Sequence, residues 1–152
     1  MSGITLLIED PKWRSHRGLT ARLTKAAQAA RRSARLKGAF TVLLANDKKL
    51  RALNYGFRGK DKPTNVLSFP AFPFVMGGPL PPMLGDIVLA AETVGREAAL
   101  EDKPLENHIT HLVIHGLLHL LGYDHETDAE AEEMEAVERR ALARLAIPDP
   151  YA

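Results

Sequence analysis

The chain has 152 residues, of which 45% are apolar and 26% charged, as is ordinary for one soluble globular domain spanning residues 1–152. It contains no cysteine, which excludes disulfides and thiolate metal sites, so any metal ligand must be a histidine or a carboxylate. The apolar run at residues 4–8 is too short for a signal peptide and no stretch could cross a bilayer, so a cytoplasmic location is expected.

The net charge of +1 conceals an uneven distribution. Residues 1–62 carry 15 Lys or Arg against 4 Asp or Glu, whereas residues 63–152 carry 5 against 15. This asymmetry predicts a basic surface for an anionic partner, with RNA the leading candidate. Solvated helix faces would account for the same charges equally well.

The first half of the chain is expected to form two strands and two helices, with strands at 3–8 and 39–45 and helices at 19–36 and 48–57. One side of the first helix is rich in leucine and alanine, and the other carries Arg22, Lys25, Arg31, Arg32 and Arg35. Its basic side could follow an RNA backbone or simply face water. Trp13 is expected to be a partly buried anchor beside this helix rather than a base-stacking group.

A turn-rich segment with the sequence RGKDKPTN follows at residues 58–65. Arg58 is its strongest functional candidate, because a guanidinium can grip a phosphate with two parallel hydrogen bonds and counter charge that develops in a transition state. The alternative for Arg58 is a surface salt bridge to Asp61.

Two further strands are expected at 66–69 and 84–90, with a helix at 92–101 after them. Residues 70–82, which hold five prolines and two glycines, predict a long loop between the two strands. Ser68 is expected to be an ordinary strand-face hydroxyl rather than a substrate contact. Asp86 could orient a metal-bound histidine without binding the metal itself.

Residues 108–125 contain five of the six histidines. At 100° per residue, His108, His111, His115 and His119 fall within an arc of about 80° on a helix. Nearly every other position there is apolar, which indicates a central buried helix whose histidine stripe faces a cleft.

The spacing of these histidines predicts a metal site. His115 and His119 are neighbours on one helix face, and Gly122 can end the helix and turn His125 towards them. Three neutral imidazoles suit zinc and leave a fourth position for water, as in catalytic sites. The alternative is a set of histidines packed in the core. His108 and His111 are expected to line the cleft or support the ligands.

The last predicted helix runs from a capping box at Thr127–Glu130 to about residue 146. Its acidic residues crowd the first half and its arginines the second, which suits the helix dipole. This acidic run is therefore attributed to helix electrostatics, and no chemistry is assigned to it.

Four sequence blocks resemble the YbeY family of bacterial endoribonucleases and ribosomal-RNA maturation factors. They are HGLLHLLGYDH at 115–125, RGKDKPTNVLSFP at 58–70, LGDIV at 84–88 and EAEEMEAVE at 130–138. They run across most of residues 50–140, while the first fifty residues carry little of the resemblance. The expected fold is α+β, with a small four-stranded sheet packed against about five helices around a central helix that bears a metzincin-like three-histidine site.

The resemblance implies a zinc-dependent, single-strand-specific endoribonuclease acting in ribosomal-RNA processing, ribosome biogenesis and quality control. One zinc ion would bind His115, His119 and His125, acidify its bound water and polarise a phosphoryl oxygen, which makes His115 catalytic as well as a ligand. Arg58 is the functionally important arginine that the resemblance places in its block. The implied substrate is ribosomal RNA, especially the small-subunit 3′ end, and the implied partners are the small subunit, one of its proteins and the Era GTPase.

Two other functions remain open from the sequence. Zinc peptidases place a general-base Glu after the first histidine of H-E-x-x-H, whereas this chain has Gly116, so peptidase activity is a weak alternative. The proton acceptor is left open among Asp124, His111, the leaving oxygen and a metal hydroxide. A non-catalytic assembly factor with a structural zinc is the other alternative, and a fourth protein ligand would favour it.

Overall fold

The computed structural model describes residues 4–15, 18–34, 38–62, 64–71, 83–123 and 126–151. The strands are β1 (Ile4–Ile8), β2 (Ala39–Ala45), β3 (Val66–Pro70) and β4 (Met83–Ala90). The helices are α1 (Leu19–Ala34), α2 (Asp47–Arg58), α3 (Ala91–Leu100), α4 (Leu105–Leu120) and α5 (Asp128–Arg144). These bounds confirm the α+β class and agree to within two residues with the strands and helices that were predicted by residue range. Most of the loop predicted at 70–82 lies outside the described residues. A 3-10 turn at Pro11–Ser15 was not predicted.

The four strands form one mixed sheet in the order β1-β2-β4-β3. β1, β2 and β4 are parallel, and β3 pairs antiparallel with β4, so β3 is an edge strand. β3 passes very close to Gly85 of β4, where a Cβ atom would lie 2.2 Å from the carbonyl oxygen of Phe69. The positive φ of 145° at this residue and the close approach of β3 both require glycine.

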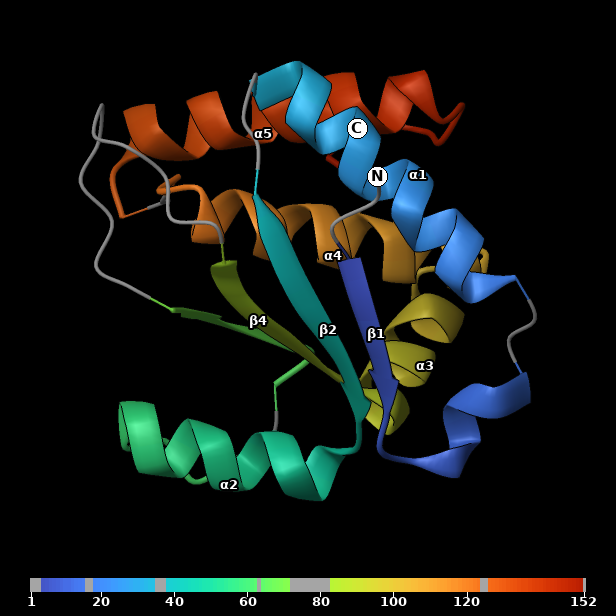
Figure 1. Cartoon of the computed structure of the whole chain (residues 1–152), viewed down its shortest axis with the longest axis vertical. Coiled ribbons are helices and arrows are strands. Elements are labelled where there is room, and N and C mark those ends of the chain that lie inside the picture. Colours follow the sequence, from blue (N-terminus) through green and yellow to red (C-terminus); the bar gives the residue numbers. More distant parts are fainter. Residues whose placement is uncertain are drawn as a thin grey trace.

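Helices cover both faces of the sheet (Figure 1). α2 lies on one face, where Leu50 packs with Val88 and Ala90 of β4. α4 lies across the opposite face against Ile87 and Leu89, and α1 and α5 pack side by side outside it. α4 is buried nearly all round, as its apolar sequence predicted. No helix in these ranges is long and apolar enough to span a membrane.

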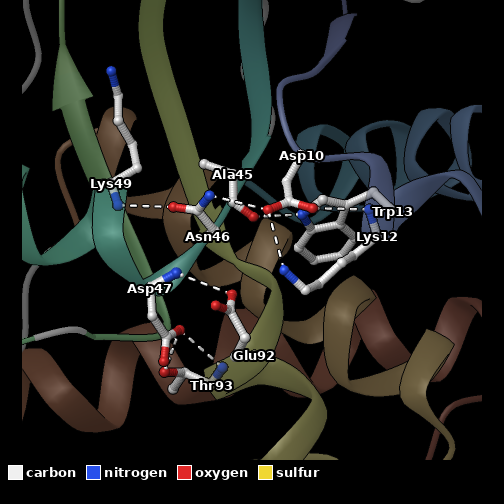
Figure 2. A network of polar contacts seen from close by, with 9 residues as sticks. All are labelled: Asp10, Lys12, Trp13, Ala45, Asn46, Asp47, Lys49, Glu92 and Thr93. Atoms are coloured by element: carbon white, nitrogen blue, oxygen red, sulfur yellow. Dashed lines mark hydrogen bonds and ion pairs between the residues drawn. The ribbon is translucent and has the colours of Figure 1, made fainter.

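Polar contacts close the sheet where β1 and β2 end (Figure 2). Trp13, which is 2% exposed, donates its indole N–H to the carbonyl oxygen of Ala45 at 2.7 Å. The Asn46 side chain caps α2 by accepting from the amide of Lys49 and donates to Asp10. Trp13 is therefore the predicted structural anchor, although more deeply buried than expected.

The first turns of α2 and α3 cap each other. Asp47 of α2 accepts hydrogen bonds from the amide and the hydroxyl of Thr93 in α3, at 3.0 and 2.8 Å. In return, Glu92 of α3 accepts from the amide of Asp47 at 3.1 Å (Figure 2). Each acidic side chain satisfies an N–H group that the other helix leaves without an internal partner. This reciprocal cap fixes the start of α2 relative to α3. It therefore also helps to set the position of Arg58, at the other end of α2.

Candidate active site

The C-terminal end of α4 is built by a glycine turn. Gly122 has a φ of 96°, its amide donates to the carbonyl of His119, and the amide of Tyr123 donates to the carbonyl of Leu118. These two bonds are the Schellman arrangement that ends many helices. The turn brings the carbonyl oxygen of Tyr123 to a distance of 3.1 Å from the Nδ1 atom of His119. Gly122 therefore ends the helix, as predicted, and also orients a histidine.

His115 is oriented by a carboxylate from another helix. Its Nδ1 atom lies 2.6 Å from Oε1 of Glu138, which is fully buried in α5. Since a carboxylate and a carbonyl only accept, both His115 and His119 donate through Nδ1. In the neutral imidazole the opposite Nε2 atom then presents a lone pair. Both rings thus have the tautomer needed for ligation through Nε2.

The Nε2 atoms of His115 and His119 are 3.2 Å apart. Two nitrogens bound to one tetrahedral zinc at 2.0–2.1 Å would be about 3.3 Å apart, so this pair fits two neighbouring zinc ligands. His125, the third predicted ligand, lies outside the described residues. Within the described part of the chain, no three His, Cys, Asp or Glu side chains are grouped as a metal site. The structure thus brings together two of the three predicted ligands.

Glu138 is the centre of a buried polar network. Its Oε2 atom accepts from the hydroxyl of Tyr151 at 2.5 Å, and its Oε1 atom lies 3.5 Å from Nε2 of His111. Burial raises the pKa of Glu138, but hydrogen bonds from His111, His115 and Tyr151 outweigh it and lower the pKa to about 2. Burial and the nearby carboxylate raise the pKa of Tyr151 above its usual value. At neutral pH, Glu138 is charged and Tyr151 donates to it.

Neither Glu138 nor Tyr151 was predicted from the sequence to belong to the site. A signal for Glu138 was present, because it falls on the apolar stripe of α5 with Met134, Val137 and Ala141, all buried. A carboxylate on such a stripe requires a buried partner. Tyr151 follows the last helix and carries no comparable pattern.

Three predictions about supporting residues need correction or refinement. His111 lies 3.5 Å from Glu138, the residue that contacts the predicted ligand His115, whereas His108 pairs with Glu97 of α3 at 3.0 Å. Both line a separate cavity of about 240 Å³ beside residues 147–150 rather than the larger cleft described below.

Asp86 is exposed and shares its sheet face with Val88, which packs towards α2. The assignment of Asp86 as a histidine-orienting residue was therefore wrong, since α4 lies on the other face. Asp124 lies outside the described residues.

The two histidines open onto a cleft of about 840 Å³ that also holds Arg58. One wall is the edge strand β3 with the two residues before it, and the other comes from the end of α4 and from Glu126. Phe57 and Arg58, the last residues of α2, complete the lining. Asp61 pairs with Arg51 at 2.7 Å, so the alternative assignment of Arg58 to a salt bridge with Asp61 was wrong.

Gly116 lies in close contact with the sheet. Its carbonyl accepts from the Ser68 hydroxyl at 3.0 Å, and a Cβ atom would lie 3.0 Å from both Ser68 Oγ and Ile87 Cγ2. Ser68 also lines the cleft, but its hydroxyl is engaged by the helix, as expected of a strand-face residue. A side chain at position 116 would need Ser68 or Ile87 to shift by a few tenths of an ångström. The general-base glutamate of zinc peptidases is absent here, since Gly116 occupies its position.

Known proteins match this chain over most of its length. The family model described as Endoribonuclease YbeY matches residues 9–146. A relative named Endoribonuclease YbeY from Chelativorans sp. (strain BNC1) is 57% identical, over 90% of this chain and 83% of its own length. A protein of the same name from Agrobacterium fabrum is 47% identical, over 98% and 94%.

The fold has a counterpart among solved structures. The solution structure of TM1509 from Thermotoga maritima aligns with a TM-score of 0.57 and 25% identity, over 98% of this chain and 99% of that chain. Together with the family match over nearly the whole chain, this confirms the resemblance carried by the four sequence blocks. The chain belongs to the YbeY family of endoribonucleases.

Proposed function

We propose that this chain is a zinc-dependent, single-strand-specific endoribonuclease that matures the 3′ end of small-subunit ribosomal RNA. Family membership makes it a hydrolase that acts on RNA, as the sequence blocks predicted. The observation that carries the metal-dependent part is the convergence of two Nε2 atoms, on His115 and His119, in a cleft that also presents Arg58.

The ligand set we propose is His115, His119 and His125. When bound there, zinc supplies a Lewis acid and brings the pKa of a coordinated water to about 7. Glu138 holds the ring of His115 through Nδ1, and the Tyr123 carbonyl holds that of His119, so neither ligand has to reorient on binding. Histidine ligands supported in this way are typical of metal centres.

Arg58 is proposed to bind the scissile phosphate. It ends α2 at the rim of the cleft, and its guanidinium can donate two parallel hydrogen bonds to phosphate oxygens. The same donors counter the negative charge that builds on those oxygens as the phosphodiester is attacked. Arg58 therefore acts on the reacting group, and its loss should leave the metal ligands intact.

We further propose that the enzyme works on the assembling small subunit, in contact with one of its proteins and with the Era GTPase. The strongly basic first 62 residues are consistent with such an RNA-rich setting. On α1, Arg22, Lys25 and Arg32 are exposed and available for backbone phosphates.

The test is cleavage of a single-stranded RNA that carries the small-subunit 3′ end, by protein loaded with one equivalent of zinc. We expect cleavage that chelation stops and zinc restores, and resistance of the same sequence when it is duplexed. His115→Ala should lose both zinc and activity. If purified wild type never cuts, even with ribosomes and assembly partners supplied, a non-catalytic assembly factor with a structural zinc becomes the better account.

A further inference from the structure

Phe57 is an apolar ring left exposed at the rim of the cleft. It is 72% exposed, although the fold buries most of its other large apolar side chains. It also lines the cleft, directly before Arg58 in the last turn of α2. Folding uses little of its apolar surface, so that surface is available to a ligand in the cleft.

The ring of Phe57 is supported on one side. Its centroid lies 5.1 Å from that of Phe69 in β3, with an angle of 58° between the rings. Phe69 is itself partly buried against the apolar cluster between the sheet and α2. This tilted contact is a favourable aromatic geometry and limits the positions of the Phe57 side chain. The rest of the ring stays accessible, so Phe57 offers a positioned aromatic surface at the cleft.

Basic residues follow this aromatic surface along the chain. Arg58 follows it directly, and α2 ends at Gly59, whose φ of 68° turns the chain into a segment with exposed Lys60 and Lys62. Aromatic rings among cations bind single-stranded nucleic acid, because bases stack on the rings while cations follow the phosphates. The cleft of about 840 Å³ is large enough for a nucleotide beside the ring.

We propose that Phe57 is a stacking platform for an unpaired base of the RNA, on the nucleotide next to the phosphate that Arg58 binds. This inference rests on the proposed function and deepens it, because it assigns the single-strand preference to a residue. A base inside a duplex is stacked on its neighbours and paired across the helix. Only an unpaired base can lie on Phe57 while its phosphate reaches Arg58.

Tyr55 provides a matched control on the same helix. It is 62% exposed, close to the value for Phe57, but it is not among the residues that line the cleft. Two residues apart on a helix, the two rings leave it in different directions. A general loss of exposed aromatic surface would therefore affect both variants, whereas stacking in the cleft requires Phe57 alone.

The experiment measures equilibrium binding of the zinc-loaded protein to a fluorescent, cleavage-resistant 2′-O-methyl oligonucleotide, whose integrity is checked on a gel afterwards. Phe57→Ala should bind the single strand about 5- to 100-fold more weakly, the range for loss of one base–aromatic stack. Phe57→Leu, which keeps apolar volume without a ring, should be similarly weak. Tyr55→Ala should bind like wild type.

Phe57→Trp supplies a direct signal. It should retain affinity, and its indole fluorescence should be quenched when the oligonucleotide binds, over a constant background from buried Trp13. Binding to the duplexed oligonucleotide should be unchanged in every variant. Because position 57 is exposed, all variants should melt close to wild type, which separates the effect from misfolding.

The outcomes separate this inference from the proposed function. If wild type binds and cuts RNA but Phe57→Ala or Phe57→Leu binds as tightly, stacking on Phe57 is wrong and the endoribonuclease stands. If the indole of Phe57→Trp is not quenched on binding, the stacking geometry is likewise wrong. If zinc-loaded wild type neither binds nor cuts RNA, both proposals fall.

Discussion

The Nδ1 atom of His115 lies 2.6 Å from a carboxylate oxygen of Glu138, a fully buried residue 23 positions further along the chain. This contact joins α5 to the histidine face of α4. It fixes the ring of His115 and directs its Nε2 atom towards that of His119. The proposed metal site thus depends on a carboxylate that no ligand motif contains.

Replacing Glu138 with Gln should weaken metal binding. Gln keeps the size of the side chain but removes the charge that makes His115 a stronger ligand. We expect zinc affinity to fall roughly 10- to 100-fold, as for other residues that orient metal ligands. The measurement is a zinc titration against a competing chelator. Glu132→Gln, at an exposed position of the same helix, is the control, and unchanged affinity in Glu138→Gln would contradict the proposed role.

Tyr151→Phe should destabilise the protein and loosen the site slightly. Tyr151 donates to Oε2 of Glu138, and its raised pKa keeps the hydroxyl protonated well above neutral pH. Loss of a hydrogen bond to a charged group should cost about 1.5–3 kcal/mol in the free energy of unfolding, measured in urea. Zinc affinity should fall less than in Glu138→Gln. Tyr55→Phe should have no effect on either quantity, and equal behaviour of the two variants would refute the assignment.

Gly116→Ala should be destabilising, although alanine is normally the better helix former. The new Cβ atom would lie 3.0 Å from side-chain atoms of both Ile87 and Ser68, so these side chains or α4 must shift by a few tenths of an ångström. We expect a loss of about 1–3 kcal/mol in the free energy of unfolding. Gly95→Ala in α3 has nothing within 4 Å of its Cβ and should instead gain about 0.5–1 kcal/mol. Thermal or urea unfolding of both variants and of wild type measures these changes in the free energy of unfolding. If both variants are more stable than wild type, or both less stable, Gly116 is not the tightly packed position that we describe.

The reciprocal cap between α2 and α3 should give a pH-dependent contribution to stability. Burial raises the pKa of Asp47, but hydrogen bonds from Thr93 and the ion pair with Arg96 outweigh it and lower the pKa below 3.8. The ionised carboxylate therefore stabilises the folded state above about pH 4, and this contribution is lost as the pH falls through the lowered value. Asp47→Asn should cost about 1–2 kcal/mol at neutral pH.

Unfolding curves of wild type and Asp47→Asn, measured in urea from about pH 6 to about pH 2.5, test this prediction. The difference in free energy between the two proteins should be largest at the neutral end and shrink towards the acidic end. A difference that stays constant across this range would mean that the charge of Asp47 is unimportant.

Local pattern was sufficient to predict the elements of this fold. The apolar periodicity gave the helices and strands, and the unbroken apolar surface around the histidines gave the buried position of α4. The strand order was not predictable, because pairing of β2 with β4 brings together residues more than forty positions apart. Because side chains alternate along β4, Asp86 and Ile87 were predicted to lie on different faces of the sheet. Which of these two faces α4 covers was known only from the structure.

The site was predictable where its residues lie on one element and not where they come from several. His115, His119 and Gly122 share a helix end, so their spacing was informative. Glu138 and Tyr151 reach His115 only because α5 and the chain after it fold back over α4. The apolar stripe of α5 signals that Glu138 is buried, but the identity of its partner depends on tertiary packing, as does the role of Tyr151.

The measurement that tests the central claim most directly is the rate of RNA cleavage by Arg58→Ala at matched zinc content. Arg58 lines the cleft but holds no proposed metal ligand, so the variant should bind one zinc as tightly as wild type and lose at least about 100-fold in rate. Arg51→Ala, which removes a guanidinium of the same helix that pairs with Asp61, should cleave like wild type. Normal cleavage by Arg58→Ala would contradict the account, because the phosphate would then have to be bound elsewhere.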